Sequence, residues 1–401
     1  MTITIGTDDD HPDTLDLSLV ERATALIPLL REEAAEGTRN RRLTPRALKA
    51  LDDAGIFRML LPQRLGGPGA TFETVAAVVA ELARGDGSAA WVSNLLVTAT
   101  GFATTFSQQA QDDVFGTDLP HTRLSGSFAP GSVGEEVEGG YRISGRWPYS
   151  TGSFAADWAT VGVLIEQPVG PPRLGLALVP SSAFTLEDTW LVAGMKATGS
   201  NTIIVDSHVV PYHRVQLLED MTAGNSATPF RDEPLARTSI PAASGLLSVA
   251  VHIGLARRAL EICCAKVPGK PVMYTSYADA ADSPTHQVAV ATASTDIHIA
   301  ELLLTEAARA VDGAARSGVE LPFEVRAKLR NNIGVVAEMA NAAIDSLMTV
   351  VGSGAFFETN ILSQIWADAA IITRHAYIDP NLGREAYGQV LLGSENRVMS
   401  L

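Results

Sequence analysis

The sequence predicts an α+β protein in which helical regions at both ends flank a central region of short strands. Two observations carry this prediction. Apolar residues recur at helical spacing before about Phe115 and again after Pro234, whereas the stretch between them alternates with a period of two and is broken by Gly, Pro and Asp. We expect three domains: an all-α domain at residues 1–118, an antiparallel β-barrel at residues 119–232 and a four-helix bundle at residues 233–401.

Local signals define helices in the N-terminal region. Thr44-Pro45 starts a helix, because Thr caps free backbone N–H groups and Pro fits the first helical position. Gly55 ends that helix, and Phe72–Arg84 carries one apolar face. The segment Ala89–Phe106 is apolar on almost every side, which predicts a helix buried all round.

Five short strands are expected in the central region, because β-branched and aromatic runs alternate there with turn residues. They are Leu124–Ala129, Tyr141–Trp147, Trp158–Ile165, Leu174–Val179 and Thr202–Val210. Gly139-Gly140 predicts a hairpin between the first two strands. Several short strands with such turns are typical of a barrel or sandwich rather than of a parallel sheet.

The C-terminal region contains three segments long enough for bundle helices, namely Leu246–Ala265, His286–Ser317 and Val325–Val351. The two cysteines, Cys263 and Cys264, are adjacent, so they form no CxxC metal motif, and we expect two buried helical residues.

The composition fits a cytoplasmic protein with a large core. Of 401 residues, 46% are hydrophobic and 19% are charged, and 30 basic against 45 acidic residues give a net charge of −15. That charge argues against partners such as nucleic acid or an anionic membrane. The longest apolar stretch, Pro241–Ala256, is too short to span a bilayer, and Met1–Asp13 lacks the apolar segment of a signal peptide.

Common catalytic motifs are missing from the sequence. It contains no strand followed by GxGxxG, no Walker loop, no HExxH and no GxSxG. The eight histidines are scattered, and His208 and His213 lack further ligands at metal-binding spacing. We therefore expect neither a Rossmann site nor a metal site.

Four motifs, in the same order along the chain, resemble the acyl-CoA dehydrogenase superfamily. They are Gly55–Gly67, the helix pair at Glu81–Trp91, the hairpin at Gly139–Trp147 and the turn Gly194–Ser200. The resemblance covers nearly the whole chain. It implies a flavoprotein, usually a homotetramer, with the flavin ring between the barrel and the C-terminal bundle.

The resemblance, together with residue chemistry, gives candidates for flavin binding. Trp147 ends a strand and is expected to stack on the flavin ring, and Ser150 is expected to hydrogen-bond its reactive edge. The backbone amides of Ser127, Phe128 and Ala129 are expected to meet the carbonyl edge of the ring. Judged without the family pattern, Trp147 is a core residue and Ser150 a turn residue.

Gly352 bears on which flavin is bound. It matches a glycine that lets the adenine approach closely in the family. We therefore expect FAD, with FMN as the alternative.

A dehydrogenase of this superfamily needs a carboxylate to remove the substrate α-proton. In the matching stretch Ala367–Tyr377, the position of that Glu is Ala376, and the residue before it is His375. Ser244 occupies the other place where relatives keep the base. Neither position holds a carboxylate, which disfavours dehydrogenation.

The segment Trp147–Gly152 and His375 are similar to the two-component flavin monooxygenases of the superfamily, which receive reduced flavin from a separate reductase. The resemblance implies that O2 adds at flavin C4a and that the resulting hydroperoxide transfers one oxygen atom. His375 is expected to donate a hydrogen bond to the peroxide or to take a proton from a phenol or indole. This branch often has a second polar residue, commonly His, in the helix that begins at Trp91. That helix has no histidine here, and Asn94 or Thr98 is the candidate donor in its place. A surface histidine with no catalytic role is the simpler interpretation of His375.

The leading hypothesis is therefore an enzyme that uses reduced flavin and O2 to hydroxylate an aromatic or heteroaromatic small molecule, such as a phenol or an indole. We expect a homo-oligomer, with four copies as the expected number. Three alternatives stay open: N-oxygenation of an amine or amino sugar, an FAD-dependent acyl-CoA dehydrogenase with a relocated base, and a flavin-free binding protein.

Overall fold

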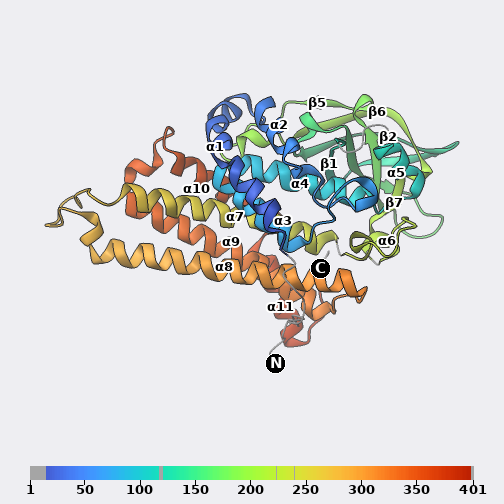
Figure 1. Cartoon of the computed structure of the whole chain (residues 1–401). Helices are drawn as coiled ribbons and strands as arrows, with labels where there is room; N and C mark the ends of the chain where they lie inside the picture. Colours follow the sequence, from blue (N-terminus) through green and yellow to red (C-terminus); the bar gives the residue numbers. More distant parts are fainter. Residues whose placement is uncertain (1–14, 117–120, 223, 239, 399–401) are drawn as a thin grey trace.

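The computed structural model describes residues 15–116, 121–222, 224–238 and 240–398 (Figure 1). Met1–Asp13, for which we expect no signal peptide, lies outside the described residues. Helices come first, strands follow, and long helices complete the chain, as the sequence predicts. The three predicted domain boundaries stay a prediction.

The N-terminal region is helical. Its helices are α1 (Leu17–Asn40), α2 (Pro45–Asp53), α3 (Phe72–Gly85), α4 (Gly87–Ala103) and α5 (Gln108–Phe115). The predicted cap of α2 is confirmed, because the Thr44 hydroxyl accepts a hydrogen bond of 3.1 Å from the Ala47 N–H. Every residue of α4 except Leu95 is buried, which confirms that this apolar helix is covered on nearly all sides.

The strands form one mixed sheet in the order β5-β6-β2-β1-β3-β4-β7. They are β1 (Leu124–Val137), β2 (Gly140–Ser150), β3 (Trp158–Ile165), β4 (Arg173–Pro180), β5 (Thr185–Glu187), β6 (Asn201–Pro211) and β7 (Val215–Leu217). All five predicted strands and the hairpin at Gly139-Gly140 are confirmed. The prediction of a closed antiparallel barrel is wrong. The sheet is open between β5 and β7, and β1 and β3 pair in parallel.

The parallel pair arises because β2 leaves β1 after a short hairpin. β1 pairs with β2 only at Glu135–Val137, and along the rest of its length it pairs with β3. The chain returns from the end of β2 to the opposite edge of β1, so β3 runs in the same direction as β1. Period-two alternation reports which face is buried and not the direction of a neighbour, so the sequence pattern could not show this.

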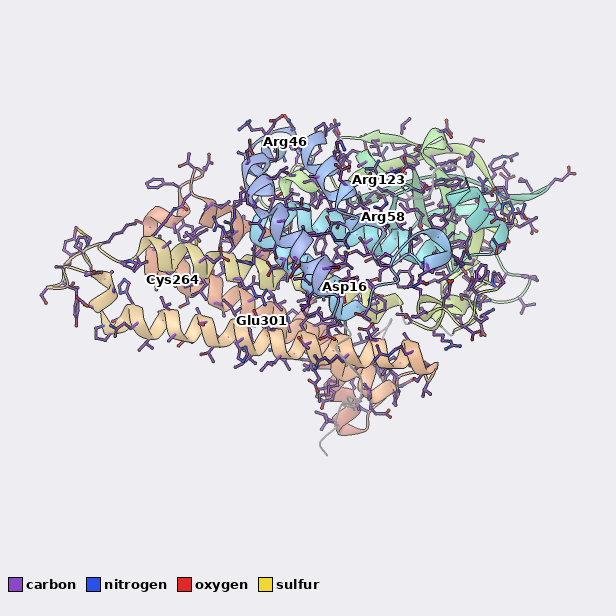
Figure 2. All side chains as sticks on the ribbon, viewed as in Figure 1. Asp16, Arg46, Arg58, Arg123, Cys264 and Glu301 are labelled. Carbon is purple, nitrogen blue, oxygen red and sulfur yellow. The ribbon has the colours of Figure 1, made fainter. Side chains whose placement is uncertain are left out.

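The C-terminal region consists of long helices that extend as an arm beyond the sheet (Figure 1). They are α7 (Ile240–Lys266), α8 (Pro284–Ser317), α9 (Phe323–Val351), α10 (Ile361–Ile372) and α11 (Pro380–Leu392). Helix α9 contacts the other four. The three predicted long helices are confirmed, whereas a four-helix bundle stays a prediction. Cys263 is buried as expected, but Cys264 lies exposed near the end of α7 (Figure 2).

Two C-terminal helices are long and apolar enough, by length and composition alone, to cross a membrane, which the apolar runs of the sequence did not suggest. They are α8 and α9, whose most apolar windows are 22% and 50% buried within the chain. Helix α9 is central to the C-terminal helices, so its apolar surface packs against α7, α8, α10 and α11. Helix α8 instead keeps apolar surface exposed.

A buried carboxyl group joins the helical and sheet regions. The backbone N–H of Met195, in the turn before β6, donates to Oδ1 of Asp368 in α10. Gly194 passes so close to α10 that a Cβ would clash with the carbonyl of Ala367. Gly87, at the start of α4, approaches Asp368 Oδ2, from which a Cβ would be 3.2 Å away. Three elements therefore meet at Asp368.

The surroundings of Asp368 favour its neutral form. Burial raises its pKa to about 8, and the nearby Asp86 carboxylate acts in the same direction. The Met195 N–H bond and Lys196 oppose this rise without cancelling it. A neutral carboxyl accepts the Met195 hydrogen bond without the cost of burying a charge.

We expect Asp368→Asn to remove a pH dependence of folding stability. The pKa rises from 3.8 to about 8 on folding, so the stability contribution of the protonated group is present below pH 3.8 and is lost as the pH rises to about 8. Asn keeps the acceptor oxygen and carries no charge. Melting temperatures should be measured from about pH 5 to about pH 9. The melting temperature of the variant, relative to that of the wild type, should increase as the pH rises.

The control for this experiment is Asp53→Asn, which removes an exposed carboxylate on α2. The control should follow the wild type across the same pH range. A constant difference between Asp368→Asn and the wild type at all pH values would contradict the expectation.

Candidate active site

Strand β1 contains a bulge at the residues expected to bind the flavin edge. The pairing of β1 with β3 shifts register between Ser127 and Pro130, which leaves Phe128 and Ala129 outside the paired positions. Gly162 of β3 faces this bulge, and a Cβ there would lie only 2.5 Å from the Ala129 carbonyl oxygen. A bulge of this kind turns backbone groups out of the ladder. Donation from the Phe128 and Ala129 amides to a ligand stays a prediction.

Strand β2 has an irregularity at the same level. Its pairing with β6 shifts register between Trp147 and Ser150. The intervening Tyr149 has a φ of 62° and is 71% exposed. The Ser127 hydroxyl donates to the Pro148 carbonyl at 3.0 Å, which joins the two irregular strand segments.

Trp147 does not face this exposed region. Its side chain is fully buried among the apolar residues of the sheet, and its indole N–H donates to the Gly162 carbonyl at 2.7 Å. The structure therefore contradicts the expected stacking of Trp147 on a flavin ring. The indole is a core side chain that supports the bulge from behind.

Ser150 is also fully buried, and its hydroxyl donates to the Trp147 carbonyl at 2.9 Å. The oxygen keeps acceptor capacity, because the single O–H proton is used in that bond. The Pro148-Tyr149 segment that precedes it is exposed. Contact between Ser150 and a flavin stays a prediction.

Buried polar contacts hold the end of β2 against the Gly194–Ser200 turn. The Gly152 N–H donates to the Thr198 carbonyl at 3.2 Å. The Ser200 hydroxyl lies 2.7 Å from that of Thr151 and 2.8 Å from that of Thr198. The segment Trp147–Gly152 and the turn Gly194–Ser200 therefore form one hydrogen-bonded unit.

Helix α4 brings His375 to the same end of the sheet. The Trp91 ring meets the His375 ring edge-on, with centroids 5.8 Å apart. The next residue, Val92, packs against Gly152, where a Cβ would be 3.3 Å from Val92 Cγ1. One turn of α4 thus connects the predicted catalytic histidine with the end of β2.

The contacts of the His375 ring favour its neutral form and one tautomer. Its Nδ1 accepts a hydrogen bond of 3.3 Å from the Tyr377 N–H, so the proton of the neutral ring is assigned to Nε2. The side chain keeps exposed surface, yet the protein around the ring lowers its pKa by desolvation, and the positive charge of Arg330 lowers it further. At neutral pH, His375 therefore presents an N–H donor.

Asn94 does not face an open site. Its side chain is 1% exposed, its amide donates to the Ser248 hydroxyl at 3.1 Å, and its oxygen accepts from Thr98 at 3.3 Å. The Asn94 side chain links α4 to α7, and a catalytic role for it stays a prediction.

Gly352 ends α9 with a φ of 85°, a conformation that favours glycine. The position is open, because a Cβ there would meet no atom of the chain within 4 Å. The backbone angle accounts for this glycine, and its contact with an adenine stays a prediction.

The carboxylates that flank His375 are both engaged. Asp368 accepts from the Met195 N–H, and Asp379 caps α11 by accepting from the Asn381 N–H at 2.8 Å. Neither is presented as a base for removing a substrate proton. The absence of a free carboxylate beside His375 among the described residues agrees with the sequence, which has Ala376 where dehydrogenases keep the catalytic Glu. Both observations weaken the dehydrogenase alternative.

Sequence reasoning missed Arg330, which contacts the turn that carries His375. Its position was nonetheless visible, because Arg330 lies between Ala327 and Ile333 on the apolar face of a long helix. A charged residue at a core position of this kind signals a specific buried contact.

Two family models match the chain on either side of the sheet. The model for the acyl-CoA dehydrogenase N-terminal domain matches residues 23–115, and the model for the C-terminal domain matches residues 246–380. HsaA, the oxygenase subunit of a flavin-dependent monooxygenase from Rhodococcus jostii, is 32% identical, and the match covers 92% of this chain and 97% of HsaA. The chain belongs to the flavin-dependent monooxygenases of the acyl-CoA dehydrogenase superfamily.

Other members of this monooxygenase family support the same placement. The oxygenase component of the FADH2-dependent resorcinol hydroxylase from Rhizobium sp. is 31% identical, with 94% of both chains covered. The structure of XiaF from Streptomyces sp., in complex with FADH2 and glycerol, gives a TM-score of 0.91 at 32% identity and covers 96% of this chain and 97% of XiaF. The predicted resemblance is confirmed, and the chain is an oxidoreductase of this family.

We expect Gly162→Ala to destabilise the bulge of β1. The new Cβ would press on the Ala129 carbonyl, and overpacking of this kind costs about 1–3 kcal/mol of unfolding free energy. Chemical denaturation monitored by circular dichroism measures this loss. The control Gly388→Ala, at an open position in α11, should leave stability unchanged or raise it. Equal stability of Gly162→Ala and the wild type would show that the bulge adapts freely.

Proposed function

We propose that this chain is an oxygenase component that hydroxylates an aromatic or heteroaromatic small molecule, with reduced FAD supplied by a separate flavin reductase. The observation that carries the proposal is the His375 N–H donor, which α4 connects through Trp91 and Val92 to Gly152 after β2, with both flanking carboxylates engaged elsewhere. Relatives named for resorcinol and indole-3-acetate support a phenol-like or indole-like substrate.

The residues at the strand ends fit the edge of a flavin. The Phe128 and Ala129 amides suit its carbonyl oxygens, and the acceptor oxygen of Ser150 suits the N–H of a reduced ring. When bound, reduced flavin reacts with O2 and supplies the oxygen atom that is transferred. FAD is favoured over FMN because XiaF was solved with FADH2, and the open position at Gly352 leaves space for an adenine.

The protein's own side chains would orient the substrate. His375 Nε2–H donates a hydrogen bond toward the reacting oxygen or the substrate hydroxyl. Trp91 covers one edge of the imidazole.

We expect His375→Ala to lower product formation by about 10²-fold or more, the usual scale for hydrogen-bond and acid–base assistance. The assay supplies chemically reduced FAD and O2 to the purified protein with a panel of phenols and indoles, and product is measured by mass spectrometry. The control is His298→Ala, which removes an exposed histidine on α8. Unchanged turnover in His375→Ala would remove His375 from the mechanism.

The same preparation tests the alternatives. Reduction of bound oxidised FAD by an acyl-CoA under anaerobic conditions would establish a dehydrogenase. Formation of an N-oxide or hydroxylamine from an amine or amino sugar in the same assay would establish N-oxygenation, for which Asn94 and Thr98 are the motivating residues; both are buried and hydrogen-bonded to each other.

We propose that the chain forms a homo-oligomer, with four copies expected from its family resemblance. Val288, Ile299 and Leu302 lie on one exposed face of α8, with exposed fractions of 66%, 39% and 57%. The opposite face of α8 packs against the chain's own core through residues such as Ile297 and Leu304. A second copy that covers the exposed face would remove this apolar surface from water.

We expect Leu302→Asp to shift the protein toward monomers, because a buried unpaired charge opposes association. Light scattering after size-exclusion chromatography measures the mass. The control Glu301→Gln, on the adjacent side of α8 (Figure 2), should keep the wild-type mass. A wild-type protein that is monomeric at micromolar concentration would contradict the proposed homo-oligomer.

A further inference from the structure

Arg330 is a buried arginine whose guanidinium donates hydrogen bonds to the turn that carries His375. Its side chain extends from α9, the residue is 8% exposed, and no carboxylate of the described residues lies within ion-pair distance of it. Its two terminal nitrogens donate to the carbonyl oxygens of Ala376 and Tyr377. The guanidinium also lies 4.9 Å from the centroid of the Tyr377 ring.

A single peptide group connects Arg330 with the imidazole. The carbonyl of Ala376 accepts from Arg330, and the N–H of that same peptide bond, on Tyr377, donates to His375 Nδ1 at 3.3 Å. A cation at the oxygen end of a peptide group polarises the N–H at its other end. Arg330 therefore strengthens the hydrogen bond that fixes the imidazole tautomer.

The same charge opposes protonation of the ring. Burial and the positive charge of Arg330 both lower the pKa of His375. From helix α4, the uncharged Trp91 ring contacts His375. On its own turn, Arg374 donates to the Ala370 carbonyl, and Asp379 is held at the start of α11, where its charge acts on Arg330.

We propose that Arg330 is a positioning residue that fixes His375 as a neutral imidazole with its proton on Nε2. The inference rests on the proposed function, and it decides between the two roles left open by the sequence. An imidazole whose Nδ1 accepts from the backbone has no lone pair on Nε2. His375 then donates a hydrogen bond to the substrate or the reacting oxygen and does not remove a proton from the substrate.

The test uses the full-length, flavin-free protein labelled with ¹⁵N-histidine. Nitrogen–proton correlation spectra report the tautomer and the pKa of each ring, and His375→Gln assigns the His375 signals. We expect the wild type to show the Nε2–H tautomer at neutral pH. In Arg330→Met, the Nε2–H tautomer should lose population and the pKa of His375 should rise toward its ordinary value.

Two further variants distinguish the effect of the Arg330 charge from the effect of its hydrogen-bonding geometry, and both from a loss of folding. Arg330→Lys keeps the charge but cannot bond both carbonyls in the same way, so the pKa should stay low while the tautomer preference weakens. The control Arg326→Met removes an arginine one turn earlier on α9 that pairs with Glu320, and the His375 spectrum should not change. Melting temperatures show that each variant is folded, and Arg330→Lys provides the test if Arg330→Met does not fold.

Kinetics provide a second readout. Product formation by Arg330→Met should fall by about 10-fold, with partial rescue by Arg330→Lys, while the apparent affinity for reduced FAD stays the same. A wild-type His375 that is protonated or carries Nδ1–H at neutral pH would overturn the inference. So would an unchanged spectrum in the Arg330 variants. If the wild type oxygenates no aromatic substrate but the spectra behave as expected, the proposed function fails and the tautomer assignment stands.

Discussion

The contact between Asp368 and the backbone of Met195 determines how the helical regions meet the sheet. It lies where α10, the turn before β6 and the start of α4 converge, and close backbone approach at Gly194 and Gly87 makes that convergence possible. A charged carboxylate would be costly at this depth. The raised pKa of Asp368 shows how the structure avoids that cost, because the group is held largely neutral.

Because α10 is held against the sheet at Asp368, the turn that follows α10 is held as well. His375 lies seven residues after Asp368, and its position relative to Trp91 of α4 depends on this shared anchor. The end of β2, the buried helix α4 and the imidazole therefore lie close together, although they come from three distant parts of the chain. Sites of this kind need supporting groups that restrict motion as much as they need reactive groups.

Much of the fold could be predicted from local pattern. The cap at Thr44, the buried helix α4 and all five expected strands follow from side-chain type and spacing. The parallel pairing of β1 with β3 could not be predicted, because alternation carries no information on strand direction. Trp147 was misassigned because a strand-end tryptophan suits a ligand and a core equally well, and only three-dimensional packing decides between them. Arg330 acts through contacts 46 and 47 residues away, which a local pattern does not encode.

The paired irregularities in β1 and β2 have a consequence for the sheet itself. At that level the ladder lacks some of its regular hydrogen bonds, so local opening there should cost less than elsewhere in the sheet. A planar heterocycle whose oxygens accept hydrogen bonds from the Phe128 and Ala129 amides would replace the hydrogen bonds that the ladder lacks there. Cofactor binding would then restrict the motion of the strand, and the strand would restrict the motion of the cofactor. Hydrogen exchange of the Phe128 and Ala129 amides would slow when the cofactor binds.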